Sequence, residues 1–181
     1  MTSGTDGRYE IAIRVRTIMQ LFDSLDPSPF RERDLDPHTE DFVVGWVREL
    51  PQAAAFNILV QLPREEATKP EAAGIGEAFA NYFRHRAEAA DLELRELFRI
   101  GWRSIIIGLI VLVACLVASQ VFAKMIGNAV LARVLEESLI IVGWVANWRP
   151  IEIYLYDWWP IRRRAVLFRR IAASPVIVRP T

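Results

Sequence analysis

An unbroken apolar run from Ser104 to Ala123 is the feature that most restricts what this chain can fold into. These twenty residues carry no charge and are mainly isoleucine, leucine, valine and alanine. Because a helix rises about 1.5 Å per residue, the run matches the roughly 30 Å hydrocarbon core of a bilayer. A helix on the surface of a soluble protein does not need to be apolar on every face. The run therefore predicts a transmembrane helix in an integral membrane protein.

Charged residues are distributed unevenly along the chain of 181 residues, although its net charge is zero. Residues 1–103 contain 13 Lys or Arg and 18 Asp or Glu, residues 104–148 contain 2 and 2, and residues 149–181 contain 7 and 2. This distribution predicts an acidic amino-terminal domain, a neutral membrane unit and a basic tail. The single cysteine, Cys115, lies in the apolar run, so neither a disulfide framework nor a cysteine-based metal site is expected.

Residues 1–74 have the pattern of a small cytoplasmic α/β domain. Apolar and polar residues alternate over residues 9–19 and 56–62, which predicts two strands. Between them Asp36 is a good helix N-cap, and apolar residues recur at helical spacing as far as Leu50. A strand, a helix and a second strand predict a parallel βαβ unit with a right-handed crossover.

Two strands do not form a stable sheet by themselves, so the predicted domain needs a further strand. Residues 175–178 near the carboxyl end are one candidate, and residues 151–156, which also alternate, are another. Pairing with a second copy of the chain is the third possibility, because an unpaired sheet edge can be covered in that way.

An amphipathic connecting helix is expected over residues 75–103, with Phe79 and Phe83 on its apolar side. Only the isolated glycines Gly101 and Gly108 interrupt its pattern before the end of the apolar run, and membrane helices tolerate such glycines. We therefore expect one helix that continues from the α/β domain into the membrane.

A second membrane crossing is expected over residues 130–148, after a turn at 127–128, although this segment contains Arg133, Glu136 and Glu137. Arg133 is spaced to form a helical ion pair with either glutamate, which lowers the cost of burying the charges. Three interpretations stay open for this group. It lies at the far membrane surface, contacts a partner membrane subunit, or lines a polar cavity or ion path.

The orientation of the resulting hairpin, residues 104–148, follows from the basic residues beside it. Arg95, Arg99 and Arg103 precede it and Arg149 follows it, which predicts that both termini are cytoplasmic, in the inner (plasma) membrane. Five tryptophans lie near the same boundary, as an interfacial aromatic belt requires: Trp102, Trp144, Trp148, Trp158 and Trp159.

Residues 149–181 predict an interfacial aromatic segment followed by a basic juxtamembrane helix. The arginines of this helix are expected to contact anionic lipid headgroups: Arg162, Arg163, Arg164, Arg169 and Arg170. A tail held at the membrane makes nucleic acid an unsuitable partner.

Small side chains in the first crossing are expected to let a neighbouring helix approach closely: Ala114, Cys115, Ala118 and Ser119.

Sequence motifs for catalysis are absent, including phosphate-binding glycine loops, nucleophile elbows, HExxH and Cys/His clusters. His85 and Glu88 have the spacing of helical metal sites, but such sites need two pairs of this kind. An acidic loop matches no EF-hand spacing and is interrupted by arginines: Asp23, Asp26, Asp34 and Asp36. We therefore expect no catalytic residue, no metal and no cofactor.

Together these patterns predict an α/β cytoplasmic domain on an α-helical hairpin of two transmembrane helices. The expected function is that of a non-catalytic accessory or scaffold subunit that helps to assemble a membrane protein complex. Its expected partners are the lipid bilayer and other membrane subunits or a second copy of the chain. The alternative is a transport or channel component that uses the polar residues of the second crossing, and an enzyme is the third possibility.

Overall fold

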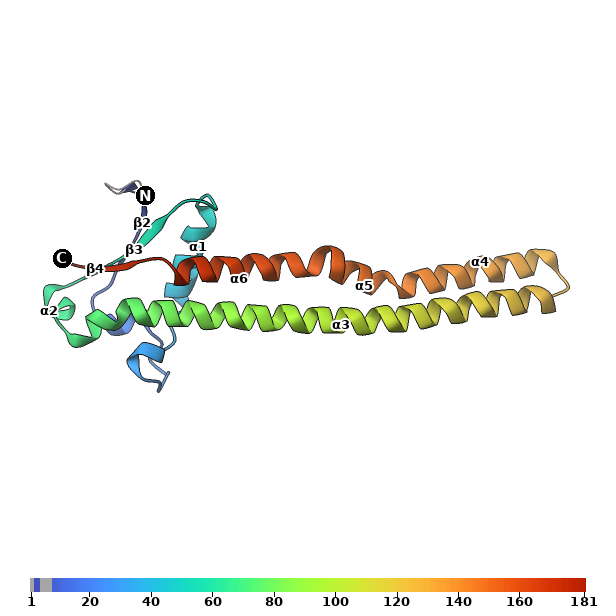
Figure 1. Ribbon diagram of the computed structural model, residues 1–181, viewed down its shortest axis with the longest axis horizontal. Helices are drawn as coiled ribbons and strands as arrows, with labels where there is room; N and C mark the ends of the chain where they lie inside the picture. Colours follow the sequence, from blue (N-terminus) through green and yellow to red (C-terminus); the bar gives the residue numbers. More distant parts are fainter. Residues whose placement is uncertain (1, 4–7) are drawn as a thin grey trace. The chain divides into compact units, whose positions relative to one another are not determined.

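A computed structural model describes residues 2–3 and 8–181 (Figure 1). The described residues form a mainly helical protein with one small sheet that is mostly parallel. They divide into two compact units, which are described separately. We call Met1–Ala90 with Arg163–Thr181 the α/β unit, and Asp91–Arg162 the helical unit.

Three parallel strands form the main part of the sheet in the α/β unit: β2 (Tyr9–Arg14), β3 (Phe56–Leu62) and β4 (Val176–Pro180). Strand β3 is central, because Ile58 pairs with Ile11 of β2 and with Val176 of β4. The two-residue strand β1 (Thr2–Ser3) pairs antiparallel with β2. The parallel strand pair and the carboxyl-terminal candidate strand are therefore confirmed.

The first strand is shorter than predicted, since β2 ends at Arg14. The side-chain oxygen of Gln20 accepts hydrogen bonds from the backbone N–H groups of Arg16 (2.8 Å) and Thr17 (3.4 Å). These bonds turn the chain into the short 3₁₀ helix η1 (Ile18–Leu21). The period-2 pattern continued past Arg14 because it records side-chain type and not these local hydrogen bonds.

The prediction of a strand over residues 151–156 is wrong, because this segment is helical. It comprises the end of α5 (Trp148–Glu152) and most of the π-helix η4 (Ile153–Asp157). Ile153 is completely buried, and its Cγ2 lies 2.9 Å from where a Cβ would stand on Gly101 of the helical unit. A single buried apolar residue at this point is compatible with a helix as well as with a strand. Alternation over so short a run therefore does not distinguish the two structures.

Helix α1 (Pro37–Glu49) connects β2 to β3 and begins as predicted. A carboxylate oxygen of Asp36 accepts hydrogen bonds from the backbone N–H groups of His38 (2.9 Å) and Thr39 (3.3 Å). Short helical turns complete the connections of this unit: η2 (Phe30–Glu32), α2 (Arg64–Ala67) and η3 (Pro70–Gly74).

The core of the α/β unit lies between one face of the sheet and the helices. It contains Ile58 and Val60 of β3 with Phe79 and Phe83 of α3 (Ile75–Met125), all at most 1 % exposed. Phe83 also packs against Phe168 of α6 (Trp158–Ala172), with ring centroids 6.0 Å apart. The prediction that α3 continues unbroken through its two glycines is confirmed.

The helical unit contains the rest of α3, a turn capped by Asn128, and α4 (Ala129–Ala146), followed by α5 and η4. Among the described residues, one helix is long and apolar enough to cross a membrane, and it spans Pro70–Met125. Only 17 % of its most apolar stretch is buried, unlike the core helix of a soluble protein. Helix α4 carries three charges within 18 residues, so the predicted second crossing is not shown.

Candidate functional site

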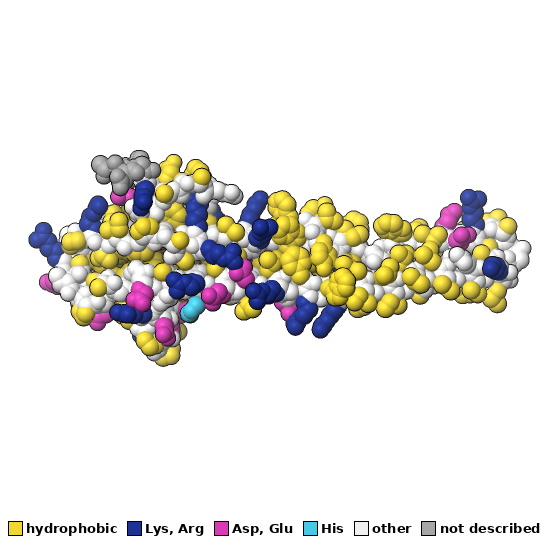
Figure 2. All heavy atoms as spheres, in the orientation of Figure 1, with side chains coloured by type: hydrophobic (Ala, Val, Ile, Leu, Met, Phe, Trp, Pro, Cys, Tyr) yellow, Lys and Arg dark blue, Asp and Glu magenta, His cyan; other side chains and the backbone are white. Residues whose placement is uncertain are grey.

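The helical unit exposes a large apolar surface. Figure 2 shows hydrophobic side chains covering the middle of this unit, with charged side chains returning at the α3–α4 turn. Large side chains that are more than half exposed come from both helices: Ile107, Ile110, Val117, Val130, Ile141 and Val145. Soluble monomers rarely expose a contiguous apolar patch larger than a few hundred Å². A surface of this kind is typical of a site that contacts a membrane or another protein.

A close contact between α3 and α4, which we call the glycine contact, holds the helical unit together. The side-chain N–H₂ of Asn147 donates to the backbone oxygens of Gly108 (3.1 Å) and Gly143 (2.9 Å). A Cβ on Gly108 would lie 2.6 Å from Oδ1 of Asn147, and one on Gly143 would lie 3.3 Å from Cα of Leu112. Neither position has room for a side chain, so the two glycines set the distance between the helices.

The four small residues predicted to pack between helices do not share one environment. Cys115 and Ser119 are buried, Ala118 is half-buried and Ala114 is exposed. Cβ of Cys115 lies 3.5 Å from where a Cβ would stand on Gly143, which places it beside the glycine contact. Cys115 thus lies on the face of α3 toward α4. A role for the four small residues in assembly stays a prediction.

A cavity of about 420 Å³ opens beside the glycine contact within the helical unit. Its lining residues include Ile105, Trp144, Asn147 and Tyr154, and most of the lining is apolar.

Four of the five predicted belt tryptophans are more than half exposed: Trp102, Trp144, Trp148 and Trp159. The fifth, Trp158, is half-buried and donates its indole N–H to the backbone oxygen of Tyr154 (2.9 Å).

The charged group of α4 forms one ion pair on the surface of the helix. Nε of Arg133 lies 3.3 Å from Oε1 of Glu137, and Glu136 is exposed. Arg133 is five residues after Asn128, about 7.5 Å along the helix axis from the turn. Glu137 is thus the partner of Arg133, and none of the three charged residues lines the cavity described above.

The predicted lipid-binding arginines also differ in their surroundings. The guanidinium of Arg162 lies over the ring of Trp158, 5.6 Å from its centroid. Arg170 donates to the backbone oxygens of Pro51 (2.8 Å) and Ala54, and it stacks on Phe56 at 5.2 Å. A lipid headgroup therefore has to compete with the protein for Arg170. The remaining three are exposed: Arg163, Arg164 and Arg169.

The acidic loop uses its carboxylates to hold its own backbone. Asp26 accepts hydrogen bonds from the backbone N–H groups of Asp34 (2.7 Å) and Ser28 (2.9 Å), and these bonds lower the pKa of its carboxyl. Asp23 accepts from the N–H of Leu25 (2.9 Å). Within residues 2–3 and 8–181, no cluster of three or more metal-ligating side chains occurs.

A polar cluster that the sequence analysis missed joins α1 to α3 in the α/β unit. The hydroxyl of Tyr82 donates to Oε2 of Glu40 (2.6 Å), and the guanidinium of Arg86 donates to Oε1 at 2.8 and 3.0 Å. Burial and the bond to Glu40 raise the pKa of Tyr82, and the same carboxylate raises the pKa of Arg86. We call these residues the Glu40 cluster.

No family model, no curated protein and no solved structure matches this chain. Two features of the described residues have the clearest physical consequence for function: the exposed apolar surface and the glycine contact of the helical unit.

Proposed function

We propose that this chain is an integral membrane protein that anchors its α/β unit at the cytoplasmic face and helps to assemble a membrane protein complex. The observation that carries the proposal is the exposed apolar surface of the helical unit. Removal of apolar surface from water contributes about 25 cal/mol per Å². This free energy favours transfer of such a surface into lipid. The aromatic side chains exposed on the same unit are typical of a membrane–water interface.

The proposal includes a second crossing by α4. Its support is the glycine contact, in which Gly143 of α4 meets Leu112 in the apolar run of α3. Helices that touch within the hydrocarbon layer lie at the same depth, so a spanning α3 favours a spanning α4. Helix α4 has 18 residues and is about 27 Å long, close to the thickness of that layer. Arg133 then lies about 7.5 Å and Glu137 about 13.5 Å along α4 from Asn128, so Glu137 is near the middle of the crossing and its charge is offset by the ion pair with Arg133.

A scaffold role is proposed because the helical unit offers an exposed apolar surface on which membrane partners can pack. In the inner (plasma) membrane, the partners are lipid and other membrane subunits or a second copy. The basic residues before and after the hairpin support a topology with both termini in the cytoplasm.

A cysteine at Asn128 is expected to react with a membrane-impermeant thiol reagent added to the outer side of intact cells. The reason is that Asn128 caps α4 at the turn between the proposed crossings. The experiment uses a Cys115→Ala background, and labelling is measured by a mass shift on a gel. Cysteines at Thr2 and Thr181 are the controls and are expected to react only after the cells are opened. Outside labelling of either terminus would contradict this topology.

The exposed pair Arg133–Glu137 supports one alternative function, that of a transport component with these charges on an ion path. Replacing Glu136 and Glu137 together by glutamine distinguishes the two functions. In a scaffold the variant is expected to lose partner binding or stability, because Arg133 loses its partner, while the ion permeability of reconstituted vesicles stays unchanged.

Glu136→Gln alone is the matched control, since Glu136 is not part of the Arg133–Glu137 ion pair and is expected to behave as wild type. An ion flux through the purified wild-type protein that the double variant lacks would establish the transport function instead.

A further inference from the structure

The outer edge of β4 has backbone groups that no described strand uses, since β4 is the last strand of the sheet. The N–H of Ile58 donates to the oxygen of Pro175 (2.9 Å), and the N–H of Thr181 donates to the oxygen of Leu62 (2.8 Å). In a parallel ladder, every second residue bonds to the same neighbour. Alternate residues from Pro175 to Thr181 therefore face β3, and those between them face outward.

The outward residues are Val176, Val178 and Pro180. Val176 and Val178 each offer an N–H and a carbonyl, while Pro180 offers a carbonyl alone. The carbonyl of Val176 lies 3.9 Å from where a Cβ would stand on Gly76 of α3, so the groups of Val178 are the better placed to accept an added strand. Pro180 limits how far the pairing extends, which is a common way to restrict edge strands.

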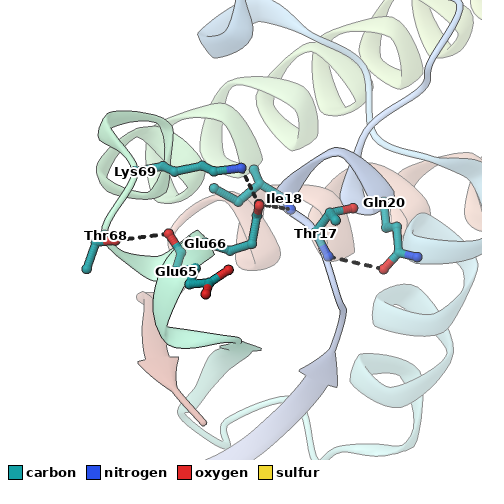
Figure 3. Close-up of polar contacts among 7 residues, drawn as sticks. All are labelled: Thr17, Ile18, Gln20, Glu65, Glu66, Thr68 and Lys69. Carbon is teal, nitrogen blue, oxygen red and sulfur yellow. Dashed lines mark hydrogen bonds and ion pairs between the residues drawn. The ribbon is translucent and has the colours of Figure 1, made fainter.

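A groove of about 790 Å³ lies beside this edge, entirely within the α/β unit. Its floor and walls combine apolar side chains with two cations: Arg64, Ala67, Lys69, Ala72, Val178 and Pro180. Polar contacts connect the α2 side of the groove to η1, as Figure 3 shows. Glu66 accepts a hydrogen bond from Lys69 and another from the backbone N–H of Ile18 (3.1 Å), and both bonds lower its pKa.

Charge complementarity indicates what the groove accepts. Its lining contains Arg64 and Lys69, and Lys69 is already paired with Glu66, so Arg64 is the cation of the lining that can meet an acidic ligand. The guanidinium groups of Arg64 and Arg179 have no hydrogen-bond or ion-pair partner within the described part of the chain. Val176 and Val178 point to the core side of β4, so Arg179 lies on the opposite side of the strand.

We propose that the edge of β4 and its groove bind an extended acidic segment of a partner protein by β-strand addition. The segment places apolar side chains in the groove and acidic side chains beside Arg179, with Arg64 at the groove rim. This surface is independent of the membrane topology, because every residue that forms it belongs to the α/β unit.

The test is fluorescence polarisation of the full-length protein in detergent with a short fluorescein-labelled peptide of alternating aspartate and valine. Saturable binding is expected, and Arg64→Glu or Arg179→Glu is expected to weaken it about three- to tenfold. Arg48→Glu is the matched control, because Arg48 is an exposed cation on α1 outside the groove, and it is expected to bind as wild type.

Two modified peptides test the mode of binding. Lysine in place of aspartate is expected to abolish binding, and N-methylation of alternate backbone nitrogens is expected to do the same, because strand pairing requires those donors. The proposal would be overturned if either modified peptide bound as tightly as the aspartate–valine peptide. It would also be overturned if both groove variants bound the original peptide as tightly as the wild-type protein does. Absence of peptide binding together with self-association that Arg179→Glu disrupts would replace the partner segment with a second copy of this chain.

Discussion

Replacement of Gly108 by leucine is expected to separate α3 from α4 and to destabilise the helical unit by about 2–4 kcal/mol. A side chain at this position meets Oδ1 of Asn147 at 2.6 Å and the backbone oxygen of Ala146 at 3.2 Å. Moving Asn147 aside removes its hydrogen bonds to both glycines, and the backbone of α4 still has to move. The measurement is the midpoint of thermal unfolding of the purified protein in mild detergent.

Gly127→Leu is the matched control for this substitution. Nothing lies within 4 Å of the position that a Cβ would occupy on Gly127, so the added side chain has space. The control is expected to change the stability by less than about 0.5 kcal/mol. An equal loss of stability in both variants would show that leucine is harmful for reasons other than the glycine contact.

Removal of the carboxylate in Glu40→Ala is expected to destabilise the α/β unit by about 2–4 kcal/mol. The half-buried hydroxyl of Tyr82 and the guanidinium of Arg86 lose their shared acceptor, and α1 loses its polar link to α3. Hydrogen exchange of the α1 amides in the full-length protein measures the effect. Glu49→Ala on the same helix is the control, since Glu49 is exposed, and its exchange is expected to match wild type.

The Glu40 cluster also predicts a dependence on alkaline pH. The pKa of Tyr82 is raised in the folded protein, so the unfolded chain releases this proton at a lower pH. The stability that Tyr82 contributes is therefore complete below about pH 10 and is lost progressively at higher pH. Tyr82→Phe is expected to lack this loss. A pH profile identical to wild type would exclude ionisation of Tyr82 as its cause.

The elements predicted well from sequence are those that local patterns determine. Strand β3 and the start of α1 follow from alternation and from the N-cap Asp36, and both agree with the structure. The alternating pattern extends β2 too far because a side chain beyond the strand, Gln20, ends it. Residues 151–156 were ambiguous because a short alternating run also fits a helix.

The contacts that define the candidate sites join residues far apart in sequence, and no local pattern records them. Glu40 and Tyr82 are 42 positions apart, and Asn147 and Gly108 are 39 apart. Asn147 did carry a local signal, since an amide four residues after Gly143 in an apolar segment suggests a polar contact between helices. Arg170 was interpreted as basic surface because charge alone does not indicate that a guanidinium stacks on Phe56.

The order of the strands along the chain has a consequence for biosynthesis. The central strand β3 precedes the helical unit, whereas its neighbour β4 follows that unit. The ribosome synthesises the chain from its amino terminus at about 5–20 residues per second, so the amino-terminal part emerges first. While the helical unit is being synthesised, the backbone groups of Ile58 and Val60 that pair with β4 therefore have no strand to bond. Folding of the α/β unit finishes only after the whole helical unit has left the ribosome, so pairing of β4 can occur only once that unit is complete.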